Sequence, residues 1–202
     1  MTNELLFGIQ TNGIKHTHAD PMPDIDTRFC MVRESGVFDY VDKTPAPEEV
    51  DQFLKASAKY GLPVRAGGWF YTLDRDAALL GHNLKLGKES GPVAHNVQVM
   101  AKESTGKPVT DAEVTDFYLR AYEIGQRYGV DPCFEVHVNM WSEDFRRVSR
   151  VARMVEARGV PFHMTLDHSH VIFKIDNPAE QEIGDIRGER GAHEAVVNAA
   201  AG

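Results

Sequence analysis

The sequence predicts an α/β protein with a parallel sheet, a (β/α) TIM-type barrel in which only about six of the eight βα units are visible. Short apolar runs alternate along the chain with amphipathic stretches of helical length. Glycines at 61, 129 and 159 each follow such a stretch and precede an apolar run, as in loops that join a helix to the next strand. Polar side chains gather where the apolar runs end, and in a barrel that end carries the chemistry. No GxGxxG follows the first run, which disfavours a dinucleotide-binding sheet.

The predicted elements follow one another in a regular order. We expect strands at 5–10, 38–42, 63–71, 93–100, 133–140 and 161–166, and helices at 24–34, 46–60, 74–88, 110–128 and 142–158, with Asp74 and Ser142 as N-caps of the third and fifth helices. Pro47 suits the first turn of the second helix. Thr110 and Glu113 have the spacing of a capping box. The alternation stops after Phe173. We therefore expect a single barrel domain over residues 1–202 that is incomplete at its C-terminal end.

Composition narrows the classes of protein to consider. The chain has 202 residues, of which 42% are hydrophobic and 26% charged, and a net charge of −8. No apolar run is long enough to span a membrane, and the N-terminus does not have the pattern of a signal peptide. The acidic balance argues against nucleic-acid binding, because the densest basic group, Arg146 to Arg153, has the spacing of an exposed helix face. Cys30 and Cys133 suggest buried free thiols, so we expect a cytoplasmic enzyme.

Three polar residues alternate along the fifth predicted strand. Because side chains alternate between the two faces of a strand, Glu135, His137 and Asn139 share one face, and the apolar residues between them share the other. The apolar face packs against helices, so the polar face points into the barrel. A buried carboxylate is costly unless it is paired or bound to a cation, which favours a metal ion. The alternative is that Glu135 and His137 form a structural pair at the rim.

A second group of polar residues follows the sixth strand. Asp167 and His170 are three residues apart where that strand ends, so both can turn toward one centre. The spacing alone is weak, but its place one βα unit after Glu135 strengthens it. Carboxylate oxygen mixed with imidazole nitrogen suits manganese, cobalt or zinc, and magnesium less well. The alternative is that Asp167 caps a turn and that His168 and His170 are solvated.

The remaining candidates lie at other strand ends. Gln10, Asn96 and Gln98 are candidates for binding substrate hydroxyls, or for a satisfied layer inside the barrel. Aromatic residues at a barrel mouth either stack on sugar faces or pack against other side chains. Both roles are open for Trp69, Phe70, Tyr71 and Trp141. His16 and His18 lie in a polar loop, and His95 lies at the other end of its strand.

Four of these segments together resemble the xylose-isomerase-like barrel superfamily. They are Phe7-Gly-Ile-Gln10, Asn96-Val-Gln98, the Phe-Glu-Val-His-Val-Asn run around Glu135, and Leu166-Asp-His-Ser-His170, and the resemblance covers about residues 5 to 175. The superfamily includes sugar isomerases and epimerases, inosose dehydratases, apurinic-site endonucleases and large subunits of C-glycoside-cleaving enzymes. The resemblance implies that Glu135 and Asp167 are metal ligands and that His170 binds substrate or a second metal.

The same resemblance implies two further ligands on two further strands. The superfamily normally adds a histidine from the seventh strand and a glutamate from the eighth. His193 and Glu194 supply these residue types, but no strand pattern surrounds them. An arc of six strands also has two unpaired edges, so we expect an oligomer or a longer natural chain.

The residues and the resemblance together lead to a functional hypothesis. We expect a metal-dependent sugar isomerase or epimerase that acts on a polyhydroxy carbonyl substrate through an enediolate, with manganese as first choice and magnesium, cobalt or zinc as alternatives. Its predicted catalytic residues are Glu135 and His170, its metal ligands Glu135 and Asp167, and its substrate-binding residues Gln10, Asn96, Gln98, His137, Trp141 and His170. The first alternative is a lyase on the same scaffold, either a dehydratase or a C-glycoside-cleaving large subunit. An endonuclease is disfavoured by the charge, and the non-enzymatic alternative is an incomplete barrel that only binds a ligand or partner.

Overall fold

The chain forms one parallel sheet of six strands. The computed structural model describes residues 5–14, 20–90 and 94–170. The strands are β1 (Gly8–Gln10), β2 (Tyr40–Asp42), β3 (Val64–Tyr71), β4 (Ala94–Val99), β5 (Asp131–Val136) and β6 (Met164–Leu166), and they lie in sequence order. Every neighbouring pair is parallel, which confirms the predicted arrangement. Just beyond the ends of β4 and β5, a single antiparallel bridge joins Met100 and Met140.

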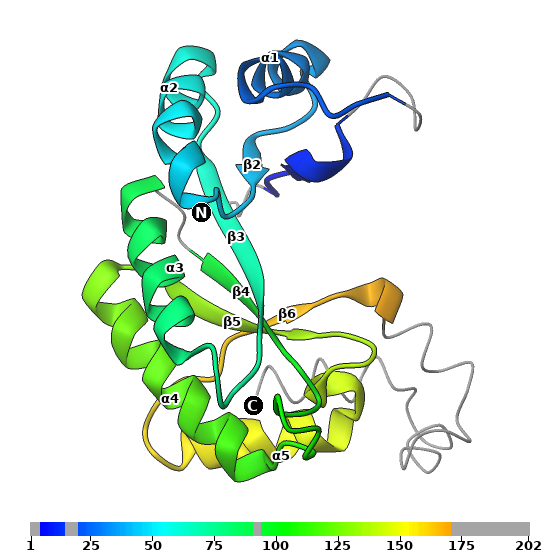
Figure 1. The fold of residues 1–202 in the computed structure, drawn as a ribbon, viewed down its shortest axis with the longest axis vertical. Helices are drawn as coiled ribbons and strands as arrows, with labels where there is room; N and C mark the ends of the chain where they lie inside the picture. Colours follow the sequence, from blue (N-terminus) through cyan, green and yellow to red (C-terminus); the bar gives the residue numbers. More distant parts are fainter. Residues whose placement is uncertain (1–4, 15–19, 91–93, 171–202) are drawn as a thin grey trace.

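Each crossover between consecutive strands contains a helix. These are α1 (Ile25–Ser35), α2 (Val50–Tyr60), α3 (Ala77–Ser90), α4 (Asp111–Tyr128) and α5 (Phe145–Glu156), with short 3-10 turns at Thr11–Gly13, Pro47–Glu49 and Trp141–Glu143. Figure 1 shows α2 to α5 along one side of the curved sheet, and consecutive helices pack against one another. In the described residues, β1 pairs with β2 alone and β6 pairs with β5 alone, so the sheet is an open arc of a barrel. No helix among these residues is long and apolar enough to cross a membrane.

Local hydrogen bonds explain where the helices begin and end. Thr110 and Glu113 form the predicted capping box at the start of α4. Gly61 and Gly129 end α2 and α4 with positive φ angles of 63° and 70°, a conformation that favours glycine. Two predicted N-caps are wrong. The Asp74 carboxylate accepts hydrogen bonds from Ser104, and α5 is capped by Asp144, which accepts a hydrogen bond from the backbone N–H of Arg146.

Residues of β4 alternate between the two faces of the sheet. His95, Val97 and Val99 are buried on the helix-facing side, where they belong to or adjoin the larger hydrophobic core. Asn96 and Gln98 are half-buried on the opposite, concave face. A smaller, separate core lies between β1, β2, α1 and α2. The larger core therefore supports the part of the sheet whose concave face carries polar side chains.

The structure shows the surroundings of the predicted basic helix face and of the two predicted free thiols. Arg147 and Arg150, from the predicted exposed basic face, both bind the Asp111 carboxylate, with Nε–O distances of 2.7 and 2.6 Å, and so join α5 to α4. Cys30 and Cys133 are unpaired and half-buried, and burial raises the pKa of the Cys133 thiol to about 11.

Candidate metal centre and neighbouring cavity

Glu135 is a buried carboxylate on the concave face of the sheet. Its neighbours Phe134 and Val136 pack into the helix-facing core, which turns Glu135 the other way although it is only 5% exposed. Its Oε2 accepts hydrogen bonds from Asn96 Nδ2 and Gln98 Nε2, each at 2.5 Å. Both donors are neutral amides on the adjacent strand β4. They orient the carboxylate, but because both are neutral, neither of them balances its negative charge.

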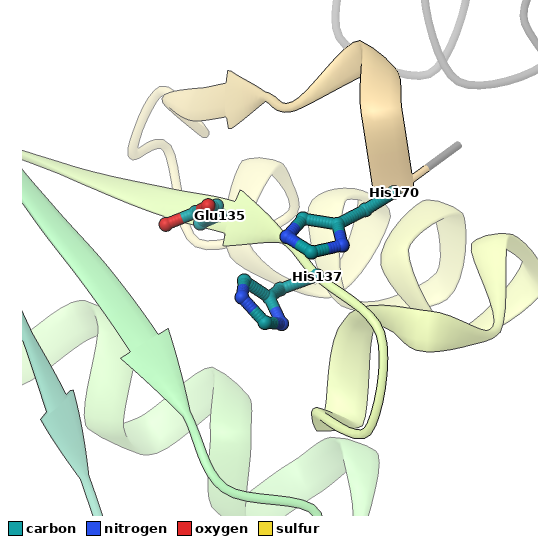
Figure 2. A group of neighbouring side chains, drawn as sticks. All are labelled: Glu135, His137 and His170. Atoms are coloured by element: carbon teal, nitrogen blue, oxygen red, sulfur yellow. The ribbon is translucent and has the colours of Figure 1, made fainter. Parts of the chain in front are cut away.

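Two histidines lie beside this carboxylate, one beyond the end of β5 and the other beyond the end of β6. The ring centroids of His137 and His170 are 3.7 Å apart, and their planes are tilted by 40°. Figure 2 shows both rings close to Glu135. His137 Nδ1 lies 2.6 Å from the Val138 carbonyl oxygen, so the tautomer that donates this hydrogen bond leaves Nε2 with a free lone pair. His170 Nδ1 is buried and has no hydrogen-bond partner among the residues that the structure describes.

These three side chains fit a divalent metal ion. One ligand atom from each of Glu135, His137 and His170 lies within 4.8 Å of the other two. Imidazole nitrogen combined with carboxylate oxygen suits zinc, manganese, cobalt and iron. A cation would also balance the buried charge of Glu135 and give the unpartnered nitrogen of His170 a partner. The donor set and the unpartnered atom therefore both favour a metal centre at this position.

Asp167 lies next to this group but faces its own turn. Its Oδ1 accepts hydrogen bonds from the backbone N–H of Ser169 at 2.9 Å and the Ser169 hydroxyl at 2.6 Å. Its Oδ2 lies 3.5 Å from His170 Nε2. Partial burial alone would raise the pKa of Asp167, but the hydrogen bonds from Ser169 and His170 hold it below its ordinary value. Within the described chain, Asp167 is not part of the three-residue group, so its predicted role as a metal ligand stays a prediction.

Ser142 connects the backbone of Glu135 and His137, the two neighbouring residues of this centre. Its hydroxyl donates a 2.6 Å hydrogen bond to the Glu135 carbonyl and accepts one of 3.2 Å from the backbone N–H of His137. The side chain is only 1% exposed. Sequence reasoning assigned Ser142 to a helix cap, and no signal in the sequence distinguishes the two roles. Asn139 also differs from expectation, because it is exposed and has a φ of 62°, which takes it off the face shared by Glu135.

A cavity of about 280 Å³ lies on the same concave face. It is lined by Gln10, Asp42, Lys43, Thr44, Gly68, Trp69, Phe70, Asn96 and Gln98. Asn96 and Gln98 thus contact both the cavity and Glu135. Phe70 is 50% exposed, and its ring meets that of His137 edge-on at 6.3 Å. The structure therefore brings three predicted substrate-binding residues, Gln10, Asn96 and Gln98, to one cavity beside the metal-binding group.

The predicted role of Trp141 in substrate binding is wrong. Its side chain is only 1% exposed and packs against Phe134 in the helix-facing core, with ring centroids 6.3 Å apart. The 3-10 turn after β5 places the indole on the side of the sheet opposite Glu135. His95 is buried on this side as well, where its Nε2 lies 2.6 Å from the Tyr71 hydroxyl, and burial lowers its pKa to about 4.

Other candidates of the sequence analysis lie in segments that are not described. His16 and His18 fall in residues 15–19, and His193 and Glu194 fall in residues 171–202, outside the described residues. Asp42 was not a candidate, although it follows the same rule as the others, since it ends a strand of the parallel sheet.

Comparison with known proteins identifies the fold. No protein-family model and no curated protein sequence matches the chain. Among solved structures, 3-keto-D-glucoside 4-epimerase YcjR from E. coli matches with a TM-score of 0.64 and 16% identity, over 88% of this chain and 73% of that one. A probable 3-DHS dehydratase, AsbF from Bacillus anthracis, matches with a TM-score of 0.61 and 11% identity, over 87% of this chain and 69% of that one. The IolI protein with a bound zinc atom matches with a TM-score of 0.54 and 14% identity, over 78% of this chain and 62% of that one.

At these identities the likeness concerns the fold. The described residues have the xylose-isomerase-like TIM-barrel fold, as the sequence resemblance predicted, in the form of an incomplete barrel. Its structural neighbours are mostly sugar epimerases and isomerases, with a dehydratase among them.

Proposed function

We propose that this chain is a divalent-metal-dependent sugar isomerase or epimerase that acts on a polyhydroxy carbonyl compound. The observation that carries this proposal is the convergence of ligand atoms from Glu135, His137 and His170 within 4.8 Å, beside a cavity rich in hydrogen-bonding side chains. The epimerase YcjR and the zinc-bound IolI protein, which share the fold, support the reaction class and the use of a metal.

The chain's own residues have distinct parts in this chemistry. A bound divalent metal would polarise the substrate carbonyl and acidify the proton on the neighbouring carbon, with Glu135, His137 and His170 as its ligands and Asp167 as a further predicted one. The amides of Asn96 and Gln98 fix the Glu135 carboxylate through one oxygen. The other oxygen is then available to bind metal or to carry the proton that is removed and returned. The predicted catalytic role of His170 as a second proton carrier requires that its imidazole is not bound to the metal, with Asp167 as the ligand in its place.

The cavity beside these groups would bind the substrate. Amide side chains such as Gln10, Asn96 and Gln98 can donate to and accept from sugar hydroxyls. The exposed rings of Trp69 and Phe70 offer apolar surface to the C–H face of a sugar. The cavity volume of about 280 Å³ is at the lower end of the range for small-molecule sites, which suits a monosaccharide.

A lyase is the second candidate, and one observation favours it. The two imidazoles lie in ring contact beside one carboxylate, so an imidazole that is not bound to the metal could serve as an acid beside the Glu135 base. A dehydratase needs both, because it removes a proton from carbon and protonates the departing hydroxyl. The fold shared with a probable dehydratase agrees with this reading.

Deuterium exchange separates these functions in one experiment. The 202-residue chain is incubated with Mn²⁺ or Zn²⁺ and a panel of ketopentoses, ketohexoses and 3-keto-glycosides in D₂O, and proton NMR follows the carbon beside the carbonyl. An epimerase or isomerase incorporates deuterium and forms a new sugar, whereas a dehydratase forms an unsaturated product. The matched control is Glu156→Gln, an exposed glutamate at the end of α5. Absence of exchange with every sugar and both metals would reject both enzymatic readings and leave a binding role.

Self-association is a separate proposal about the same chain. Leu5, Leu6 and Phe7 are 75%, 40% and 54% exposed next to the edge strand β1. Exposed apolar residues at a sheet edge favour pairing with another chain. We expect an oligomer in sedimentation velocity at low micromolar concentration and its loss in Phe7→Lys. A sharp monomer for the unmodified chain would contradict this.

A further inference from the structure

Asp42 occupies the cavity wall formed by β2. It is the last residue of that strand and lines the cavity together with Gln10 from β1 and Gly68 from β3. The pairing between β2 and β3 is irregular here, since Val41 faces Val64 whereas Asp42 faces Ala66. Its side chain is half-buried on the same concave face as Asn96 and Gln98. Asp42 therefore belongs to the same cavity as the predicted sugar-binding residues, on a different wall.

Among the described residues, the carboxylate of Asp42 has no hydrogen-bond donor. Within the described residues, no hydrogen bond or ion pair to this side chain is present. The nearest cation in sequence, Lys43, is directed elsewhere, because its ammonium lies 3.5 Å from Glu49 Oε2 and over the Phe53 ring at 5.5 Å. Burial raises the pKa of Asp42, and the negative charge of Glu135 raises it further. A half-buried acceptor without a partner is unfavourable in the free protein, so it suits a ligand that brings donors.

Backbone packing keeps the neighbouring wall free of side chains. A Cβ atom on Gly68 would lie 2.9 Å from Asn96 Cβ, closer than the packing allows. A Cβ atom on Gly67 would lie 2.4 Å from Thr44 Oγ1 and 3.0 Å from the Thr44 backbone nitrogen. The two glycines therefore let β3 pass close to its neighbours, and Gly68 contributes only backbone to the cavity between Asp42 and Asn96.

We propose that Asp42 is a specificity-determining residue whose carboxylate accepts hydrogen bonds from hydroxyl groups of a neutral sugar, on the part of the molecule remote from the reacting carbon. This inference rests on the proposed function for the position of the reacting carbon beside Glu135. Asp42 lines the cavity and Glu135 is hydrogen-bonded to two of its lining residues, so the negative charges of both carboxylates disfavour an anionic ligand there. The substrate class is therefore an unphosphorylated polyhydroxy ketose or keto-glycoside rather than a sugar phosphate.

The expected loss of sugar affinity follows from the kind of hydrogen bond that is lost when the Asp42 carboxylate is removed. A hydrogen bond to an ionised acceptor is stronger than one between neutral groups, and its removal weakens binding by about 10- to 100-fold. Asp42→Ala removes the acceptor entirely, whereas Asp42→Asn retains one carbonyl oxygen that can accept. We expect Asp42→Ala to weaken binding more than Asp42→Asn does, and to raise KM with little change in kcat.

Binding measurements test this inference apart from catalysis. Calorimetry with Mn²⁺ present measures a panel of ketopentoses and ketohexoses, the 4-, 5- and 6-deoxy analogues of the tightest binder, and its phosphate ester. The proteins are the unmodified chain, Asp42→Asn, Asp42→Ala and the control Asp116→Asn, which changes an exposed residue of α4. Circular dichroism checks that each variant is folded.

The proposal predicts a specific pattern of affinities. The unmodified chain and Asp116→Asn bind the neutral sugar, bind one deoxy analogue about 10- to 100-fold more weakly, and bind the phosphate ester more weakly still. Asp42→Ala binds the sugar and that deoxy analogue equally.

Equal affinity of Asp42→Ala and the unmodified chain for the sugar, tighter binding of the phosphate ester, or no binding of any neutral sugar would each overturn the proposal. If the binding pattern holds but no deuterium exchange occurs, Asp42 is a sugar-binding residue and the proposed reaction is wrong.

Discussion

The two ends of the sheet are built differently. Around β4 and β5, large buried side chains such as Tyr118, Phe134 and Trp141 fill the space between sheet and helices, and the concave face holds an oriented carboxylate. Around β1 and β2 the strands have only three residues each, the core is small, and Asp42 has no donor within the described chain. On the proposed function, the well-packed half would hold the reacting groups rigidly, and the lightly packed half would contribute Asp42 to the selection of the substrate.

Replacement of the central carboxylate is expected to have the largest effect. Glu135→Gln removes a charged metal ligand and the predicted proton carrier, so the exchange rate should fall by about 10²- to 10⁴-fold and Mn²⁺ binding should weaken. The fold should be nearly unchanged, because the amide still fits beside Asn96 and Gln98. Calorimetry, deuterium exchange and thermal unfolding measure the three quantities. A large loss of stability with metal binding intact would instead favour a purely structural pair of Glu135 and His137.

The difference in packing between the two halves can be tested directly with two phenylalanines. Phe134 is 1% exposed in the larger core, whereas Phe7 is 54% exposed beside β1. Phe134→Ala should lower the free energy of unfolding by about 3–5 kcal/mol, and Phe7→Ala should change that of the dissociated monomer by less than about 0.5 kcal/mol. Urea denaturation measures both. Similar losses in the two variants would mean that Phe7 is covered, for example by a second copy of the chain.

Loss of the Ser142 hydroxyl should have a smaller effect than Glu135→Gln on the metal centre and than Phe134→Ala on stability. Ser142→Ala leaves the Glu135 carbonyl and the His137 N–H without this partner in a buried place, at a cost of about 1–3 kcal/mol in stability. Groups that orient metal ligands typically contribute about 10- to 100-fold in metal affinity, and we expect a loss in this range for Zn²⁺. Ser149→Ala, which changes a serine within α5 rather than in the turn before it, is the matched control. Unchanged zinc affinity in Ser142→Ala would show that the loop after β5 holds His137 in place without this serine.

Much of this arrangement follows from patterns that the sequence contains. Alternation of apolar runs and helices, together with glycine stops, predicted six parallel strands in order. The rule that polar residues gather at strand ends brought Gln10, Asn96 and Gln98 to one cavity. A 3-10 turn at Trp141–Glu143 precedes α5. Hydrophobic periodicity does not detect such a turn, so the predicted start of this helix and the predicted position of the Trp141 indole were both wrong. Such turns depend on tertiary hydrogen bonds that no local pattern records.

Asp42 shows the other limit of the sequence analysis. A single aspartate at the end of a three-residue strand has no motif around it, and only its neighbours in space make it notable. Applied to β2, the strand-end rule would have selected Asp42 as it selected Gln10. Asp167 is the opposite case. Its spacing to His170 is a recognisable sequence pattern, but its Oδ1 accepts hydrogen bonds within the local turn. Spacing along the chain is therefore a weaker guide to this centre than position at the end of a strand.

The smallest expected effect concerns the stability contributed by Asp42 itself. Burial, helped by the charge of Glu135, raises the pKa of Asp42 above its ordinary value of 3.8. A carboxyl group whose pKa is raised by folding stabilises the fold below the unfolded pKa, and this contribution is lost as the pH rises through the folded value. At pH 7 the ionised side chain therefore destabilises the free protein. Asp42→Asn should raise the urea midpoint at pH 7, and the difference should shrink as the pH falls toward 4.

The same variant relates stability to sugar binding. If the carboxylate is retained for its ligand at a cost to the fold, a neutral sugar should raise the urea midpoint of the unmodified chain more than that of Asp42→Asn. Asp116→Asn, on the exposed face of α4, should show neither the pH-dependent gain nor the reduced response to sugar. A lower midpoint for Asp42→Asn at pH 7 would mean that the folded chain already supplies a donor to this carboxylate. The sugar would then have no unpartnered acceptor to bind, and the lightly packed half of the sheet would lose its proposed role in substrate selection.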